Sequence, residues 1–590
     1  MIRTRLLHNT FTKTGDLPYM QNFKLKTAEK ILSAMKELSD SLTFTVEEIA
    51  EMLEYPPDST MGDVAFPCFR LSKVLRNAPP KIAAALAEKT ADFEYGTSAA
   101  VGGYLNFKIG DNYLCDSVLA AIETEGDKYG SSNIGEGKTV VLDYCSPNLM
   151  KPFHIGHLGT TVIGHSLKLL HEFVGYKCIG INYLGDWGTQ FGKQIAAYKK
   201  WGDKAVIEEG GVDELVKLYV RYNNECEDND ALKDEARAEF HKLEEGDEEN
   251  LALWKWFVDI SFEECKKTCD LLGVTFDSFK GESFYTDKMP AQVEKLRELG
   301  LLKLDDGASI VDLADYNMPP CLILKKDGST LYPTRDIAAA VYRKNTYDFD
   351  KCIYVTSSAQ SLHFAQWFKV VELMGYDWHE GLVHVPYGTV SIDGAKLATR
   401  TGNVVLLRDL FKLSIDKVRE IMGEKIADPE TREEVAQAVG VGAIVFNYLY
   451  NSRIKDINFT LEQALSFEGS TGPYAQYTYA RTCSILAKAA EAGIEPVGGT
   501  CTHESEAALL KTLSRFPEKV NDAIEEYEPS NITRYVIEVC TAFNRFYRDC
   551  PIVTAESDEQ KAFRIRLTAA AKSVLGNALH LICLKTPEKI

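Results

Sequence analysis

A β-branched run, a pair of histidines and an apolar helical segment follow one another near residue 150. Residues 139–144 read Thr-Val-Val-Leu-Asp-Tyr, residues 154–157 read His-Ile-Gly-His, and apolar residues recur at helical spacing from 158 to 173. This order predicts a buried strand, a turn and a helix N-terminus. Backbone N–H groups and the helix dipole favour phosphate there, and Gly156 lets a nucleoside approach closely. In isolation, a surface histidine pair or half a zinc site would look the same.

The surrounding residues carry a resemblance. Residues 143–157, Asp-Tyr-Cys-Ser-Pro-Asn-Leu-Met-Lys-Pro-Phe-His-Ile-Gly-His, resemble the signature of class I aminoacyl-tRNA synthetases, and most closely the arginyl-tRNA synthetase family. Further segments agree in order and spacing: 184–192, 331–338, 467–474 and 587–590. Residues 61–67 and 101–107 resemble the added N-terminal domain of that family. The resemblance therefore covers nearly the whole chain.

Length and cysteine pattern limit the class of protein. A chain of 590 residues can bury several cores, so we expect three domains. It has no apolar run of about 18 residues, so we expect no membrane span. Its 14 cysteines include no Cys-x-x-Cys, and the closest pair, Cys265 and Cys269, lies one helical turn apart. We therefore expect reduced thiols in a cytoplasmic protein and no metal held by protein ligands.

The net charge of −20 taken alone argues against a nucleic-acid partner. Much of the acid lies between 225 and 249, however, where it reads as a solvated helix end or loop. The C-terminal part carries seven basic residues that could form one basic face, although salt-bridged helices would look the same: Arg534, Arg545, Arg548, Lys561, Arg564, Arg566 and Lys572.

We predict a multidomain α/β protein. Residues 1–20 are expected to be a flexible extension, and 21–125 an α+β N-terminal domain. Residues 126–455 alternate strands and helices, which predicts a doubly wound parallel-sheet (Rossmann-like) catalytic domain with a helical insertion at about 186–302. Residues 456–590 read as an all-α bundle. The strand candidates in the sheet are 139–144, 177–183, 320–324, 351–356 and 383–390. By resemblance, the N-terminal domain binds the tRNA elbow and the C-terminal bundle binds the anticodon.

The resemblance implies an arginine-tRNA ligase. Such an enzyme activates L-arginine with ATP and Mg²⁺ to arginyl-adenylate and pyrophosphate, then transfers arginine to the 3′-terminal adenosine of its tRNA. Two anions must meet, so catalysis is mainly positioning and charge neutralisation. The predicted ATP and catalytic residues are His154, His157, Lys151, Phe153 and Gly156, with Lys396 and Arg400 in a loop, 396–403, that resembles the Lys-Met-Ser-Lys-Ser loop of class I.

Three residues depart from the family pattern. Gly159 stands where relatives usually carry arginine, and Ala398 and Thr401 replace a hydroxyl and a cation in the phosphate loop. Together these changes remove two positive charges near the triphosphate. Slower activation, or a divergent paralogue, would follow.

Recognition of arginine should depend on carboxylates, because the planar guanidinium fork pairs with them bidentately. By resemblance these are Asp143 and Asp336. Their alternatives are a strand-end acid that caps a loop and a helix N-terminal acid. Tyr332 would form a pocket wall, and the amino and carboxylate groups of arginine would meet Ser146, Asn148 and Gln360.

The second half-reaction requires a tRNA specific for arginine. Unpaired anticodon bases are read by stacking and by hydrogen bonds to their edges. The candidates are Tyr474, Tyr477, Arg481, Tyr547 and Arg548, although tyrosines at helical spacing are more often core residues. We expect a monomer.

Three rival functions remain open at this stage. The nearest is a paralogue that activates arginine for another acceptor or not at all. The others are a His-x-Gly-His nucleotidyltransferase, which has no reason to carry a helical C-terminal domain, and a non-catalytic RNA-binding protein.

Overall fold

The computed structural model describes residues 19–39, 42–56, 58–151, 153–227, 229–392, 395–396, 405–424 and 426–590. Most of the predicted extension at 1–20 lies outside the described residues. So do Ala398, Arg400 and Thr401 of the predicted phosphate loop, and only the backbone of Lys396 is described.

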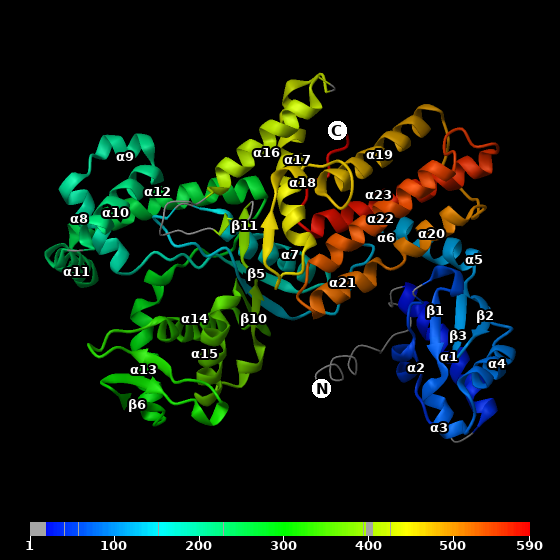
Figure 1. The fold of residues 1–590 in the computed structure, drawn as a ribbon, viewed down its shortest axis with the longest axis horizontal. Coiled ribbons are helices and arrows are strands. Elements are labelled where there is room, and N and C mark those ends of the chain that lie inside the picture. Colours follow the sequence, from blue (N-terminus) through cyan, green and yellow to red (C-terminus); the bar gives the residue numbers. More distant parts are fainter. Residues whose placement is uncertain are drawn as a thin grey trace.

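The N-terminal domain packs helices on a small antiparallel sheet (Figure 1). Strands β1 and β2 flank β3 in the order β1-β3-β2, and Gly102, with φ of 56°, makes the tight turn between β2 and β3. The first helix of this domain starts at Tyr19. The elements are α1 Tyr19–Leu38, α2 Val46–Met52, β1 Val64–Pro67, α3 Ser72–Leu75, α4 Pro79–Lys89, β2 Gly96–Val101 and β3 Tyr104–Ile109.

The parallel sheet predicted for the centre of the chain is confirmed, with four strands in the order β10-β9-β4-β5. They are β4 Thr139–Asp143, β5 Lys177–Ile181, β9 Lys351–Ser357 and β10 Leu382–Tyr387. The chain enters at β4, crosses to β5 through α7 Leu158–Phe173, and later returns on the other side of β4 as β9. The strand order therefore reverses between β4 and β9, where ligands bind in doubly wound sheets.

The strand predicted at 320–324 forms, but not in this sheet. β8 Cys321–Leu324 pairs antiparallel with β7 Ala308–Val311, which pairs with β6 Leu302–Asp305. Burial alternates along β8, with Cys321 and Ile323 buried and Leu322 exposed. One solvated face is typical of antiparallel sheets, whereas strands of a covered parallel sheet are buried on both faces.

Helices fill the chain between β5 and β6, as predicted for the insertion. They are α8 Thr189–Trp201, α9 Lys204–Gly210, α10 Val212–Cys226, α11 Asp230–Glu245, α12 Glu248–Leu272 and α13 Met289–Glu298. Two more helices, α14 Tyr332–Tyr347 and α15 Ser361–Leu373, lie beside β8 and the parallel sheet.

The C-terminal part is helical, with one strand that the sequence reading missed. β13 Ile457–Phe459 pairs in parallel with β11 Val390–Ile392, which also pairs with β12 Ala395–Lys396. A boundary at 455 would separate β13 from its partner. The helices are α16 Leu407–Met422, α17 Pro429–Tyr450, α18 Leu461–Ala464, α19 Gly472–Glu491, α20 Glu504–Leu513, α21 Phe516–Glu525, α22 Ser530–Asp549 and α23 Asp558–Leu581.

The N-terminal domain and the C-terminal helices lie side by side (Figure 1). Lys511 Nζ lies 2.7 Å from Asp63 Oδ2 across this contact. The chain between the two parts forms α5 Asp111–Tyr113 and α6 Ala120–Glu125, and the Gly126 carbonyl after α6 accepts a hydrogen bond from Asn577. Among the described helices, none is both long and apolar enough to cross a membrane.

Candidate active site

The turn that follows β4 is strained and held at several points. Cys145, Ser146 and Met150 have φ values of 71°, 42° and 62°, a left-handed conformation that residues other than glycine seldom adopt. Thr160 Oγ1 accepts a hydrogen bond from the Cys145 N–H at 3.0 Å, and Asn182 Oδ1 accepts one from the Ser146 N–H at 3.1 Å. Such strain persists where the surroundings over-determine it, which is typical of functional sites.

The two histidines close a reciprocal cap at the helix start. His154 Nδ1 accepts a hydrogen bond from the Gly156 N–H at 3.0 Å, and His157 Nδ1 accepts one from the His154 N–H at 3.1 Å. A backbone N–H can only donate, so each ring keeps its proton on Nε2. A Cβ at Gly156 would lie 2.7 Å from His154 Cε1, so only glycine fits this cap. The pair therefore offers two Nε2–H donors at a helix N-terminus.

Both imidazoles are neutral at physiological pH. Burial lowers the pKa of His154, and the Lys151 charge lowers it further. Burial and the neighbouring His154 lower the pKa of His157 to about 3. Phe153 is buried and stacks on the His157 ring at 4.9 Å between centroids. The histidines thus act as hydrogen-bond donors, and exposed Lys151 supplies the positive charge.

The predicted phosphate loop is anchored on both sides of its undescribed part. The backbone of Lys396 pairs with Ser391 in the β11–β12 ladder. On the other side, the Ile155 N–H donates to the Val405 carbonyl at 3.3 Å and the Leu407 N–H to the Phe153 carbonyl at 3.0 Å. The chain therefore leaves the loop directly against the histidine segment.

Asp143 is already engaged inside the protein. Its Oδ1 accepts a hydrogen bond from the Ser146 hydroxyl at 2.7 Å, and its Oδ2 lies 2.7 Å from Arg343 Nη2. Asp143 is the counter-ion that the described residues give the buried Arg343 guanidinium. The guanidinium packs near the rings of Tyr183 and Tyr354. The strand-end aspartate thus neutralises a buried arginine from α14.

A second group of charges lies at the start of α14. Asp336 Oδ2 is 2.6 Å from His363 Nε2, and Arg335 Nη1 is 2.6 Å from Glu282 Oε2. Burial, together with the negative charges of Asp336 and Asp186, raises the pKa of Glu282 to about 7, against the opposing charge of Arg335.

Buried polar atoms in this region lack partners. The Tyr183 hydroxyl and Arg335 Nε are buried, and neither has a hydrogen-bond partner among the described residues. Burial raises the pKa of Tyr183, so its hydroxyl stays protonated and can donate. Orphaned donors next to acids are expected in a pocket for a polar ligand.

The remaining predicted arginine-binding residues are open to solvent. Tyr332 is 67% exposed at the first position of α14, with the Arg335 guanidinium 5.9 Å from its ring centroid. Gln360 and Asn148 are also exposed. Gly185 packs against Asn148, because a Cβ at Gly185 would lie 2.4 Å from Asn148 Oδ1.

Four of the five predicted tRNA residues gather on one surface. The Arg481 guanidinium lies 5.0 Å from the Tyr477 ring centroid and 5.1 Å from that of Tyr547, and both tyrosines are over 40% exposed. Asn544 links Arg481 to Tyr474: its side-chain oxygen accepts a hydrogen bond from Arg481, and its amide donates one to the Tyr474 hydroxyl at 2.9 Å. Arg548 instead pairs with Asp549 at 2.8 Å.

The sequence reading missed Arg343, Glu282, His363 and Asn544. A signal existed for Arg343, because it lies seven residues after Asp336 and therefore on the same face of α14. Glu282 and His363 carried no such signal, since each lies in a segment outside the recognised motifs.

Comparisons with known proteins agree with this geometry. The family described as "tRNA synthetases class I (R), catalytic domain" matches residues 118–461. The "Arginyl tRNA synthetase N terminal domain" matches 26–109, and the "DALR anticodon binding domain" matches 475–590.

Whole-chain relatives point the same way. The arginine–tRNA ligase of Alkaliphilus metalliredigens is 50% identical over 97% of this chain and 100% of its own length. That of Clostridium perfringens is 49% identical over 94% and 99%. The fold resembles the arginyl-tRNA synthetases of Thermus thermophilus (24% identity, TM-score 0.79) and Plasmodium falciparum (22%, 0.77), each covering 96% of this chain and 99% of its own. The chain therefore belongs to the arginine–tRNA ligases, the arginyl-tRNA synthetases of class I.

Proposed function

We propose that this chain joins L-arginine to its tRNA, using ATP at the site after β4. The observation that carries the proposal is the pair of neutral histidines, with Nε2–H donors at a helix N-terminus, at the point where the strand order of a parallel sheet reverses. The histidine donors at the helix N-terminus suit an anionic phosphate, and the neighbouring acids suit a cationic amino acid.

In the first step, the arginine carboxylate attacks the α-phosphate of ATP in line, the bond to the β-phosphate oxygen breaks, and pyrophosphate leaves with its electron pair. His154 and His157 donate to the triphosphate, while Lys151, Lys396 and Arg400 provide charge. Mg²⁺ enters with ATP. Phe153 stacks on His157 and so supports it in position. Phe153 and Gly156 also border the space for the nucleoside.

The arginine side chain binds beside α14. Asp336 meets the guanidinium, with Glu282 and the orphaned Tyr183 hydroxyl as further partners. Asp143 contributes through Arg343 and Ser146, and Ser146, Asn148, Tyr332 and Gln360 hold the rest of the substrate.

A pocket that hydrogen-bonds the whole guanidinium rejects lysine and citrulline, because each leaves buried polar groups unpaired. It discriminates poorly against canavanine, a near-isostere of arginine. Strong exclusion of canavanine in an aminoacylation assay would count against this pocket.

The tRNA contacts two surfaces. Residues 456–590 receive the anticodon on the patch of Tyr474, Tyr477, Arg481 and Tyr547, where aromatic faces and a guanidinium suit unpaired bases. Residues 21–125 bind the tRNA elbow. The N-terminal domain supports this role with exposed aromatic and basic residues. Phe69, Arg70, Lys73 and Arg76 are close in sequence, and the ring of Tyr104 lies 5.2 Å from that of Phe69.

We place the protein in the cytoplasm as a monomer. All fourteen cysteines are free, which suits a reducing compartment. Light scattering on the purified chain tests the oligomeric state.

The decisive experiment is ATP–pyrophosphate exchange over a panel of amino acids, with and without bulk tRNA. Exchange with arginine and with no other amino acid supports the proposal. The comparison with and without tRNA shows whether adenylate formation needs bound tRNA. Folded protein that binds tRNA yet exchanges with no amino acid would instead favour the divergent paralogue.

A further inference from the structure

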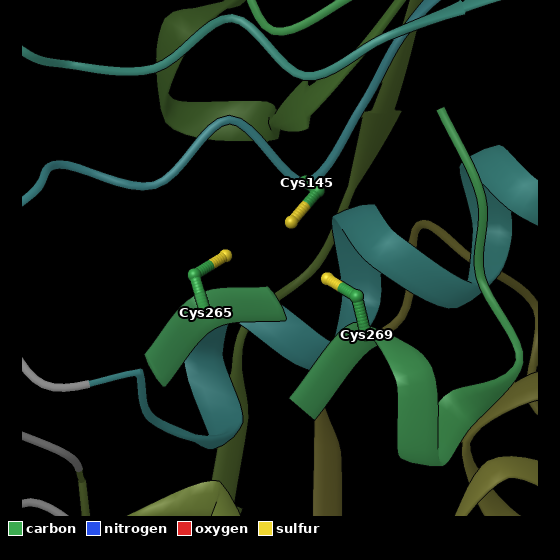
Figure 2. Close-up of side chains that lie close together, drawn as sticks. All are labelled: Cys145, Cys265 and Cys269. Carbon is green, nitrogen blue, oxygen red and sulfur yellow. The ribbon is translucent and has the colours of Figure 1, made fainter. Parts of the chain in front are cut away.

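Three cysteine sulfurs meet beneath the active-site turn. Cys265 and Cys269, four residues apart, lie on one face of α12, and Cys145 reaches them from the strained turn after β4. Their Sγ atoms all lie within 4.8 Å of one another. Figure 2 shows the three sulfurs directed toward a common point. The sequence spacing argued against a zinc site because it could not show the third thiol.

The cluster is secluded from water. Cys145 is 2% exposed, and Cys265 and Cys269 are each 4% exposed. No fourth histidine, cysteine or carboxylate joins them among the described residues. A structural zinc ion usually takes four protein ligands, and a buried site gives little access to a water that could serve as the fourth.

Charge also selects the ligand. Three thiolates carry three negative charges, and Asp270 of α12 adds another nearby. A buried charge without a partner is costly, so a bound centre must compensate all three. A divalent ion leaves one negative charge, whereas a trivalent centre with three bonds leaves none.

We propose that Cys145, Cys265 and Cys269 form a binding site for one trivalent, three-coordinate thiophilic metalloid, the class to which arsenite belongs. In the reaction with arsenous acid, three As–O bonds break and three As–S bonds form. The three thiol protons leave with the three hydroxyl groups as water, and arsenic keeps its oxidation state.

Binding at the three cysteines should alter the active site, because Cys145 belongs to the turn that also carries Ser146. Its N–H is held by Thr160, and the next residue, Ser146, donates to Asp143. Drawing the Cys145 sulfur toward α12 therefore disturbs a turn that already has strained backbone. This consequence, unlike the binding itself, rests on the proposed function.

Native mass spectrometry of the full chain, incubated overnight with arsenite in buffer without dithiols, tests the site. We expect one adduct whose mass gain is one arsenic minus three hydrogens. Cys265→Ser and Cys269→Ser should each lose it. Cys501→Ser is the matched control: it breaks the separate Cys115–Cys501 thiol pair, 3.7 Å between sulfurs, and should keep the adduct.

Absence of the three-proton adduct would overturn the proposal, as would its persistence in both α12 variants. An arsenic adduct that replaces only two thiol protons, or binding of zinc to the chain that is tighter than binding of arsenite, would also overturn it. In parallel, arsenite should abolish pyrophosphate exchange in the unmodified chain and spare it in Cys265→Ser. Absence of exchange before treatment would refute the proposed function and leave the mass measurement valid.

Discussion

Replacing Asp143 with Asn should destabilise the catalytic domain strongly. The Arg343 side chain is 1% exposed and its counter-charge is Asp143, 7% exposed and 2.7 Å away. Among the described residues, Asp143 is the acid paired with Arg343, so Asn would leave a permanent charge buried without a counter-ion. Removing one partner of a buried ion pair costs about 3–5 kcal/mol. That is a large share of a typical domain stability of about 5–15 kcal/mol.

Urea unfolding followed by tryptophan fluorescence measures this loss. Trp367 is fully buried in the same core as Tyr354, which packs near Arg343, so it reports on this part of the sheet. The double variant Asp143→Asn with Arg343→Met is the control. Replacing both members of a buried pair by groups without charge is often nearly neutral, so most of the lost stability should return. A shift below about 1 kcal/mol for the single variant, or no recovery in the double, would refute the assignment.

Kinetics of the same pair of variants separate two roles for Asp143. If it serves only to neutralise Arg343 and position Ser146, the double variant should recover the KM for arginine together with its stability. If Asp143 contacts the substrate guanidinium directly, stability should return and the KM should stay raised.

Changes at three further residues have expected outcomes. Glu282 has its pKa raised to about 7 by burial, so its charge appears as the pH rises through 7; the KM for arginine should fall over that range, and Glu282→Gln should flatten the profile. Stability changes in the opposite direction: the folded chain keeps a proton that the unfolded chain releases near pH 4.5, so stability falls as the pH rises from about 4.5 to about 7. Glu282→Gln should reduce that loss in urea titrations. His157→Ala should lower kcat by about 10²–10³, as loss of one donor to a developing anion does, and His157→Asn should lose less. Arg481→Ala should raise the KM for tRNA and reduce its salt dependence by about one charge; an unchanged KM would remove Arg481 from the tRNA surface.

Local patterns account for what could be predicted. The β-branched run of β4, the helix periodicity of α7 and the His-Ile-Gly-His turn between them are all set by neighbouring residues, and all three form. The same holds for Tyr474, Tyr477 and Arg481 of α19, whose spacing places them on one helix face.

Long-range pairing accounts for what could not be predicted. Strand candidates do not reveal their partners, so β8 was assigned to the parallel sheet although it pairs with β7. β13 has only three residues, too few for a clear period. The arrangement of Cys145 over Cys265 and Cys269 joins segments more than a hundred residues apart, which no spacing rule detects.

Gly159 shows how a local interpretation can miss a distant cause. Its difference from the family pattern suggested the loss of a cation near the triphosphate. In the fold Gly159 is buried, and a Cβ there would lie 2.1 Å from the Tyr448 hydroxyl and 3.1 Å from the Tyr387 ring. Tyr448, on α17, thus fills the space into which a longer side chain would extend. Restoring arginine at 159 should therefore destabilise the chain by overpacking, about 1–3 kcal/mol or more, without adding a useful charge. Arginine should be tolerated only when Tyr448 is made small as well, and if Gly159→Arg alone raised exchange activity at unchanged stability, the absent cation would be the correct explanation.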